Sequence, residues 1–272
     1  MIPKLEFMEG KLEDNVGIIV NFFNWNYHSN FTKELMVNMT EEEKKQIIRD
    51  KLLQKRHTIN FKETKETFQT VWDYRGDKIL TEISNILDEP WDGTEFREGE
   101  KFNKKNTVIG YIHDNLPAYP RNIKYSNFHL NHNNSPNFIP LLGNHEIGHF
   151  LFFKKFYKIF PELDSKENPT YDFPNAPWLL SELIAVPMTN EPSMKKILHL
   201  KNDSKGYSEF ENKEMNLIDG LPIQTYFNNF YERCKKRGMS ATDIIIESYK
   251  EVLKYESTII GAFEKTKYFS SK

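Results

Sequence analysis

The pattern of apolar residues in the first third of the chain is typical of helices. Thr40 and Glu43 form a capping box, a common helix start, and apolar residues then recur at helical spacing to about His57. The same spacing continues over Phe61–Leu87, with an interruption near Gly76. We therefore expect this part of the chain to be mostly helical.

The pattern changes to alternation after a turn cluster at residues 89–93. Thr107–His113 and Asn122–Leu130 are rich in β-branched and aromatic residues and predict two strands, of which we expect the second to form a sheet edge. A small sheet between helical blocks indicates an α+β fold. We expect a helical N-terminal part over residues 1–90 and a second domain over residues 91–272.

The remainder of the chain is again patterned for helices. An apolar run over residues 138–160 has Pro140 near its first turn, and another begins at Pro177 behind the capping residue Asn175. Three more helices are expected after these, at residues 193–201, at 209–236 with a break over 219–222, and at 241–265 behind Ser240 and Asp243.

Composition and charge exclude several classes of protein. Hydrophobic residues make up 38% of the 272 residues and aromatic residues 14%, which suffices for a core. Lys and Arg (37) nearly balance Asp and Glu (39), so no net field favours nucleic acid or an anionic membrane. The single cysteine, Cys234, excludes an intrachain disulfide and a multi-cysteine zinc module.

The sequence also lacks the signals of a membrane or secreted protein. No stretch approaches the roughly 18 apolar residues of a membrane span, and the N-terminal residues carry charges where a secretory signal is apolar. We expect a cytoplasmic protein with neither nucleic-acid nor membrane partners. Export by a route that reads no N-terminal signal remains open, and nothing in the sequence indicates the oligomeric state.

The strongest chemical signal is His145-Glu146-x-x-His149 inside the apolar run at residues 138–160. Histidines four residues apart lie on one face of a helix, so their imidazoles can bind the same metal ion. Glu146 follows the first histidine, where a carboxylate can take a proton from a water molecule that attacks a carbonyl group. This is the position of a general base.

A catalytic zinc ion needs three protein ligands and an open fourth position. A metzincin would carry its third histidine six residues after His149, but Lys155 stands there. Glu182 is the best remaining candidate because it is the only ionisable residue of the apolar segment at residues 177–185, and an unpaired buried carboxylate is costly. The alternatives for Glu182 are a solvent-exposed position or an ion pair, and the competing carboxylates of the polar loop are Glu162, Asp164, Glu167 and Asp172.

The sequence HEIGH, followed by a segment reading SELIA, resembles the gluzincin metallopeptidases. The resemblance covers His145–Ala185 and implies a zincin-like metallopeptidase core over residues 91–272, with a small sheet, an active-site helix and C-terminal helices. It implies His145, His149 and Glu182 as zinc ligands, Glu146 as catalytic base and a peptide or protein as substrate. Gly148 is also similar to the glycine of lethal-factor-like peptidases.

One residue and one missing segment distinguish this chain from known branches of the family. Thermolysin-like members have an aspartate four residues after the third ligand, where this chain has Val186, and the substrate-binding Gly-x-Met-Glu-Asn segment of the aminopeptidases is absent. Several gluzincins place a transition-state-stabilising tyrosine shortly before the third ligand, which implies Tyr171 as the oxyanion donor. The alternatives for that role are Tyr207, Tyr226, Tyr231 and His199.

Two functions of different kinds follow. The first is a zinc-dependent peptidase in which Glu146 activates water. The second is a non-catalytic, metal-stabilised module on a zincin scaffold that binds a peptide or protein. An intact Glu146 favours the first, because a purely structural metal site has no use for a base at that position.

Overall fold

The computed structural model describes residues 2–24, 39–92, 106–114, 121–122, 126–164, 175–207, 210–211 and 217–264. The chain forms two compact units, which we name by their described residues. The sheet unit lies within Pro3–Tyr74 and Phe96–Pro140, and the helical unit within Arg75–Glu95 and Leu141–Thr266. The domain boundary expected after residue 90 stays a prediction.

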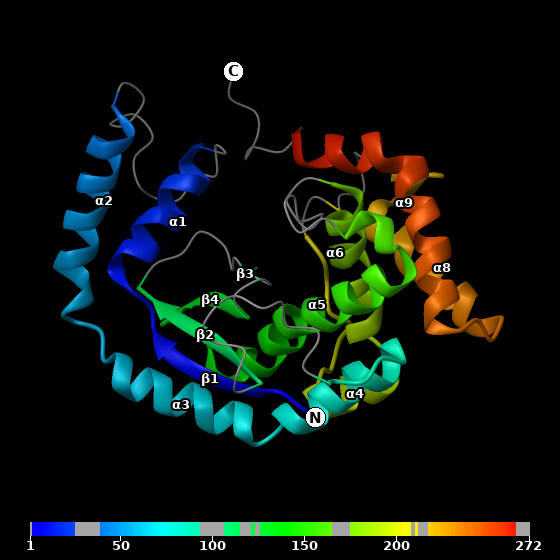
Figure 1. Cartoon of the computed structure of the whole chain (residues 1–272), viewed down its shortest axis with the longest axis horizontal. Helices are drawn as coiled ribbons and strands as arrows, with labels where there is room; N and C mark the ends of the chain where they lie inside the picture. Colours follow the sequence, from blue (N-terminus) through cyan, green and yellow to red (C-terminus); the bar gives the residue numbers. More distant parts are fainter. Residues whose placement is uncertain are drawn as a thin grey trace. The chain divides into compact units, whose positions relative to one another are not determined.

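The sheet unit contains a four-stranded sheet of order β1-β2-β4-β3 (Figure 1). Strands β1 (Lys4–Glu9), β2 (Thr107–His113) and β4 (Asn127–Asn131) are parallel, and β3 (Arg121–Asn122) is antiparallel to β4. The strand predicted at residues 107–113 is confirmed. The fold is α+β, as the pattern indicates.

The prediction of a single edge strand at Asn122–Leu130 is wrong. The segment contains the two strands β3 and β4, and β4 lies between β2 and β3 rather than at an edge. Ser126 adopts a left-handed backbone (φ 52°) immediately before β4. Because β3 and β4 are antiparallel, β3 pairs back onto the strand that follows it.

Strand β1 is an element that the sequence analysis missed. Its buried residues, Leu5 and Phe7, alternate with exposed Lys4 and Glu6, which is the signature of a half-buried strand. Gln69 of helix α3 (Phe61–Asp73) donates to Leu5 O (2.9 Å) and accepts from Phe7 N (3.1 Å). A helix side chain thus satisfies the backbone of this edge strand, which would otherwise be open to further pairing.

The two other helices of the sheet unit are α1 (Leu12–Asn24) and α2 (Glu41–Arg56), and they pack through an apolar cluster. The predicted capping box is confirmed, since Glu43 N donates to Thr40 Oγ1 (3.3 Å) and Thr40 N donates to Glu43 Oε2 (2.7 Å). The predicted break near Gly76 is also confirmed, because α3 ends at Asp73. A short 3-10 turn (Pro136–Phe138) completes the unit.

The helical unit is built from helices and one short hairpin. Asp219 and Gly220, both with positive φ, form the turn between β5 (Leu217–Ile218) and β6 (Leu221–Pro222). The break expected over residues 219–222 is therefore confirmed, and the helix after it begins at Ile223. Residues 217–218, expected to be helical, form β5 instead, and most of residues 209–216 lie outside the described residues. The helices are α4 (Gly76–Leu87), α5 (Ile139–Ile159), α6 (Ala176–Thr189), α7 (Pro192–Leu198), α8 (Ile223–Lys236) and α9 (Ala241–Glu264), with a 3-10 turn at Pro161–Leu163.

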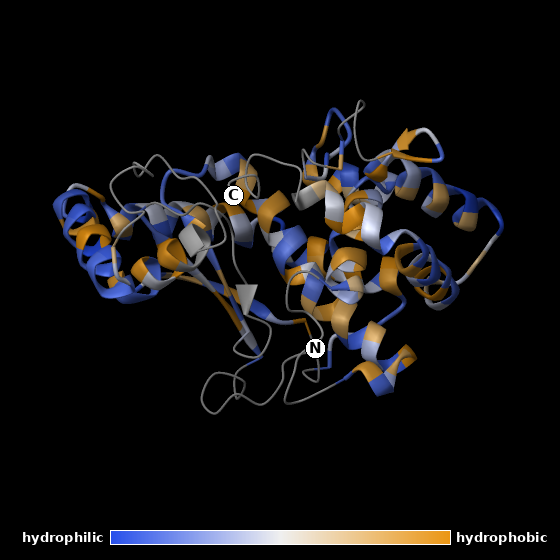
Figure 2. Ribbon diagram, turned by 90° about the horizontal axis from the view of Figure 1, so that it is seen from above, coloured by the Kyte–Doolittle hydropathy of each residue, from blue (hydrophilic) through white to orange (hydrophobic). Residues whose placement is uncertain are grey.

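Helix α6 lies at the centre of the helical unit, buried along most of its length and packed against α8 and α9. Hydrophobic and hydrophilic residues alternate along the surrounding helices, as expected where each helix buries one face (Figure 2). Among the described residues, none of the helices combines the length and the apolar character that crossing a bilayer requires.

Candidate metal centre

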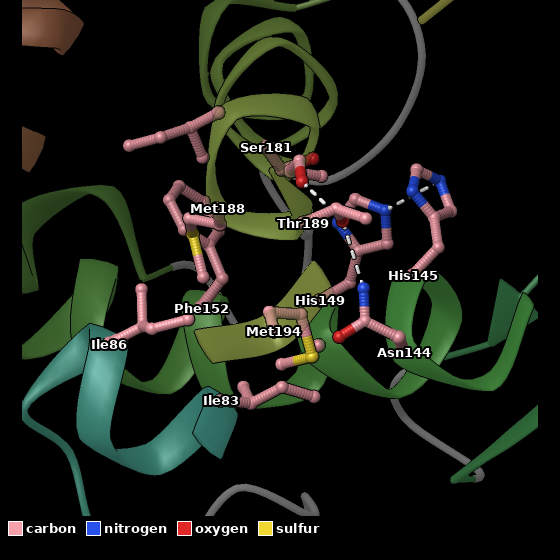
Figure 3. A pocket seen from close by; sticks show the side chains of 13 residues that line it. Ile83, Ile86, Asn144, His145, His149, Phe152, Ser181, Met188, Thr189 and Met194 are labelled. Atoms are coloured by element: carbon pink, nitrogen blue, oxygen red, sulfur yellow. Dashed lines mark hydrogen bonds between the residues drawn. The ribbon is translucent and has the colours of Figure 1, made fainter. Parts of the chain in front are cut away.

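Helix α5 carries the HEIGH sequence, and apolar residues within and next to this sequence fix the helix in the core. Ile147 and Phe150 are fully buried. The helical spacing brings the rings of His145 and His149 together at nearly a right angle, with centroids 4.6 Å apart and an interplanar angle of 88° (Figure 3). Their Nε2 atoms are 3.2 Å apart. The two imidazoles therefore converge as the spacing predicts.

Helix α6 brings Glu182 to the same place. The side chain of Asn175 caps this helix by accepting from Trp178 N (2.9 Å), and Pro177 lies in the first turn. Glu182 is only 2% exposed. Its Oε2 lies 3.2 Å from His145 Nε2, and its Oε1 lies 3.6 Å from His149 Nε2. Glu182 thus faces the histidine pair.

His145, His149 and Glu182 could hold one metal ion. Their ligand atoms all lie within 4.8 Å of one another, and no other such group of His, Cys, Asp or Glu occurs among the described residues. Zinc bonds of about 2.0–2.2 Å in a tetrahedron separate neighbouring ligand atoms by about 3.4 Å. The two Nε2 atoms are 3.2 Å apart, and they lie 3.2 and 3.6 Å from the two different oxygens of Glu182, so each separation is close to this value. Two imidazoles and one carboxylate are also a donor set that zinc accepts.

Glu146 lies beside the three candidate ligands but is not one of them. Its Oε1 is 3.9 Å from His145 Nε2, and the residue is 2% exposed. The His145 side chain, by contrast, is 30% exposed, so the centre adjoins the protein surface on that side. If the group holds a metal ion, a buried carboxylate at this place could exchange a proton with a molecule bound to the ion.

A polar tether connects the two helices of the centre. Asn144 of α5 donates from Nδ2 to Thr189 Oγ1 of α6 (2.9 Å), and Thr189 Oγ1 donates in turn to Ala185 O (2.8 Å) (Figure 3). Asn144 and Thr189 are both buried. Asn144 directly precedes His145. The tether therefore fixes the distance between α6, which carries Glu182, and the part of α5 that carries the two histidines.

A small cavity of about 20 Å³ adjoins the two histidines, with room for about one water molecule. Neither Glu146 nor Glu182 lines it, so it does not extend to the carboxylates. Its polar lining comes from Asn144, Ser181 and Thr189 besides the histidines. Most of the remaining wall is apolar and comes from four helices, with Ile83, Ile86, Phe152, Ile184, Met188 and Met194 (Figure 3).

The predicted oxyanion donor, Tyr171, lies outside the described residues. Two of its alternatives have hydroxyl groups that already donate to carboxylates: Tyr226 to Glu251 and Tyr231 to Glu191. Burial and the adjacent carboxylates raise the pKa of both phenols. Both hydroxyl groups are therefore already engaged in hydrogen bonds within the helical unit.

The remaining alternatives are less constrained. The ring of Tyr207 packs on Trp178, one helical turn before Glu182, with centroids 6.2 Å apart. His199 ends α7 in a left-handed conformation (φ 58°) and is exposed. Of the competing third ligands, Glu162 and Asp164 are exposed, whereas Glu167 and Asp172 lie outside the described residues.

The sequence analysis missed Asn144 and Thr189. Both were detectable as uncharged polar residues within apolar helices, but such residues are common, and nothing in the sequence pairs one with the other. The hydrogen bond depends on how α5 and α6 pack, which local patterns do not specify.

Comparison with known proteins finds no relative of this chain. No protein-family model, curated protein sequence or solved structure shows significant similarity to this chain.

Proposed function

We propose that this chain is a zinc-dependent peptidase with a gluzincin-like fold. The observation that supports it most directly is the set of short distances among His145, His149 and Glu182, three side chains that could each give a zinc ion one ligand atom and leave one position for water or substrate. The position of Glu146 beside this group favours catalysis over a purely structural role for the metal.

The residues of the centre have different roles in the proposed hydrolysis of a peptide bond. A zinc ion bound there would polarise the scissile carbonyl and make water a stronger acid. Glu146 accepts the proton of the attacking water and can return it to the departing amine. His145, His149 and Glu182 would hold the ion, and the Asn144–Thr189 tether keeps the two helices at the required spacing.

The zincin fold itself is supported by the order of elements. A small mixed sheet precedes helix α5 with its HEIGH sequence, and α6 follows with the third candidate ligand. The substrate class follows from the same chemistry, because two histidines, a glutamate ligand and a glutamate base form the set that gluzincin peptidases use to hydrolyse peptide bonds.

The proposal is tested by Glu146→Gln, with Glu232→Gln at an exposed position of α8 as the matched control. Both variants and the unchanged protein are purified without added zinc, assayed for metal by elemental analysis and incubated with a peptide library. We expect about one zinc ion per chain in all three. Hydrolysis should fall about 10²–10⁴-fold in Glu146→Gln alone, because only this variant lacks the base.

The other outcomes are equally informative. Full hydrolysis by Glu146→Gln would remove this residue from the mechanism. Unchanged protein that carries no zinc and takes up none would overturn the metal centre. Stoichiometric zinc without cleavage of any library peptide would favour the alternative function, a metal-stabilised module that binds a peptide or protein.

A further inference from the structure

Helix α6 has a defect close to the third candidate ligand. Pro187 lies inside the helix and has no backbone N–H, so it cannot bond to the carbonyl oxygen four residues earlier. That oxygen belongs to Leu183, the residue after Glu182, and Leu183 is fully buried. A buried carbonyl without a donor would weaken the helix at the turn that carries Glu182.

Gln224 of α8 supplies the donor that Pro187 lacks. Its Nε2 donates to Leu183 O at 3.0 Å, and the same amide nitrogen donates to Asn228 Oδ1 at 2.9 Å. Gln224 is completely buried. Because both acceptors are oxygens, the –NH₂ end of the amide must face them, so the side chain has one orientation.

The surroundings of Gln224 are shaped for this side chain. A methyl group at Gly206 would lie 2.4 Å from Gln224 Oε1, closer than any real contact, so a glycine at this position leaves the space that the amide fills. The backbone N of Gln224 also donates to Phe210 O (3.0 Å). Hydrogen bonds therefore hold Gln224 at its backbone N–H and at the amide nitrogen that ends its side chain.

We infer that Gln224 is a positioning residue for the metal centre: it replaces the missing N–H of Pro187 and fixes the turn that presents Glu182. The inference rests on the proposed zinc site. Glu182 must keep its carboxylate oxygens 3.2 and 3.6 Å from the two histidine nitrogens, and a shift of about 1 Å suffices to spoil a site of this kind. Gln224 touches neither metal nor substrate and acts through the backbone of α6.

The test is zinc affinity, measured by competition with a chromophoric chelator on the full chain. Gln224→Met keeps the length of the side chain but removes both donors. We expect it to weaken zinc binding about tenfold, at the lower end of the effect of residues that support metal ligands. Asn228→Ala removes the other acceptor of Gln224, leaves the bond to Leu183 in place and should change the affinity less than about twofold.

The double variant Gln224→Met/Pro187→Ala separates positioning from packing. Alanine restores the N–H at position 187, which can bond Leu183 O as in an uninterrupted helix. We expect the double variant to bind zinc within about threefold of the unchanged protein. A side chain that merely fills space beside α6 would not be rescued by a new backbone N–H at another position.

Gly206→Ala is a second probe that keeps Gln224 in the chain but forces its amide to move. Gly206→Ala replaces Gln224→Met in the test if Gln224→Met does not fold. We expect Gly206→Ala to bind zinc more weakly than the unchanged protein, and we expect the additional substitution Pro187→Ala to restore the affinity. Two results would overturn the role of Gln224 and leave the proposed zinc site intact, provided that the unchanged protein binds zinc. The first is that Gln224→Met and Gly206→Ala bind zinc as tightly as the unchanged protein. The second is that they bind it more weakly and that Pro187→Ala does not restore the affinity. Absence of zinc binding in the unchanged protein overturns the proposed function and this inference with it.

Discussion

At the scale of the residue, the proposed metal centre depends on Glu182, the candidate third ligand. His145 and His149 owe their proximity to one helix, but Glu182 is contributed by another. We expect Glu182→Ala to weaken zinc binding by more than about a hundredfold, because losing even an indirect supporting residue costs about 10–100-fold. Glu162→Ala, a carboxylate exposed in the loop after α5, is the matched control and should bind zinc as the unchanged protein does.

Elemental analysis after dialysis, together with chelator competition, measures both variants. Equal metal content in Glu182→Ala and the unchanged protein would assign the third ligand to another residue. A loss of zinc in Glu162→Ala of the same size would point to the loop carboxylates as ligands.

At the scale of the element, the hydrogen bond between α5 and α6 makes a separate prediction. Thr189→Val keeps the shape of the side chain but removes the buried oxygen that accepts from Asn144 Nδ2. The amide is left buried without this acceptor, so we expect the free energy of unfolding to fall by about 1–3 kcal/mol. Thr81→Val is the matched control, since Thr81 is exposed on α4 and its hydroxyl bonds only its own helix, at Asp77 O.

Chemical denaturation of metal-free protein gives both values. The control should change the free energy of unfolding by less than about 0.5 kcal/mol. A Thr189→Val variant as stable as the control would show that the Asn144–Thr189 bond does not hold the two helices together.

At the scale of the whole molecule, a pair of histidines in the sheet unit, one buried and one half-buried, makes stability depend on pH. His113 Nε2 lies 2.8 Å from His129 Nδ1, at the end of β2 and within β4. Burial, with repulsion from His129 and Arg56, lowers the pKa of His113 to about 3, and burial lowers the pKa of His129 to about 4. Both rings are therefore neutral in the folded protein at neutral pH.

The sign of the effect follows from proton binding. Below pH 6.5 the unfolded chain binds protons at these histidines and the folded chain does not, so stability falls as the pH is lowered. The loss between pH 7 and pH 5 is roughly 2 kcal/mol per histidine. Burial raises the pKa of the nearby Asp114, whose protonation acts in the opposite direction.

Urea unfolding of His129→Gln and the unchanged protein at pH 7 and pH 5 measures this contribution, because burial, the largest cause of the low pKa of His113, persists in the variant and the more distant ionisable groups cancel. We expect the variant to lose about 2 kcal/mol less over this interval. Equal losses in the two proteins would show that His129 is protonated equally in the folded and unfolded states.

Elements with a strong local signal were predictable from the sequence. The capping box of Thr40 and Glu43, the break near Gly76 and the long helix with HEIGH depend on residues a few positions apart, and the structure contains all of them. The elements that the sequence analysis missed have a short sequence pattern or depend on which strands pair with each other. Strand β1 is only six residues long, and β3 and β4 were merged because alternation does not reveal a chain reversal.

By itself, the sequence determined that two imidazoles would lie side by side with a carboxylate next to them, because the period of the helix fixes side chains four residues apart. Only the tertiary structure decided that Glu182 faces this pair, that Asn144 bonds Thr189 and that Gln224 serves the carbonyl left free by Pro187. Each of these contacts joins residues tens of positions apart. They depend on how helices pack over the whole core, which no local pattern encodes.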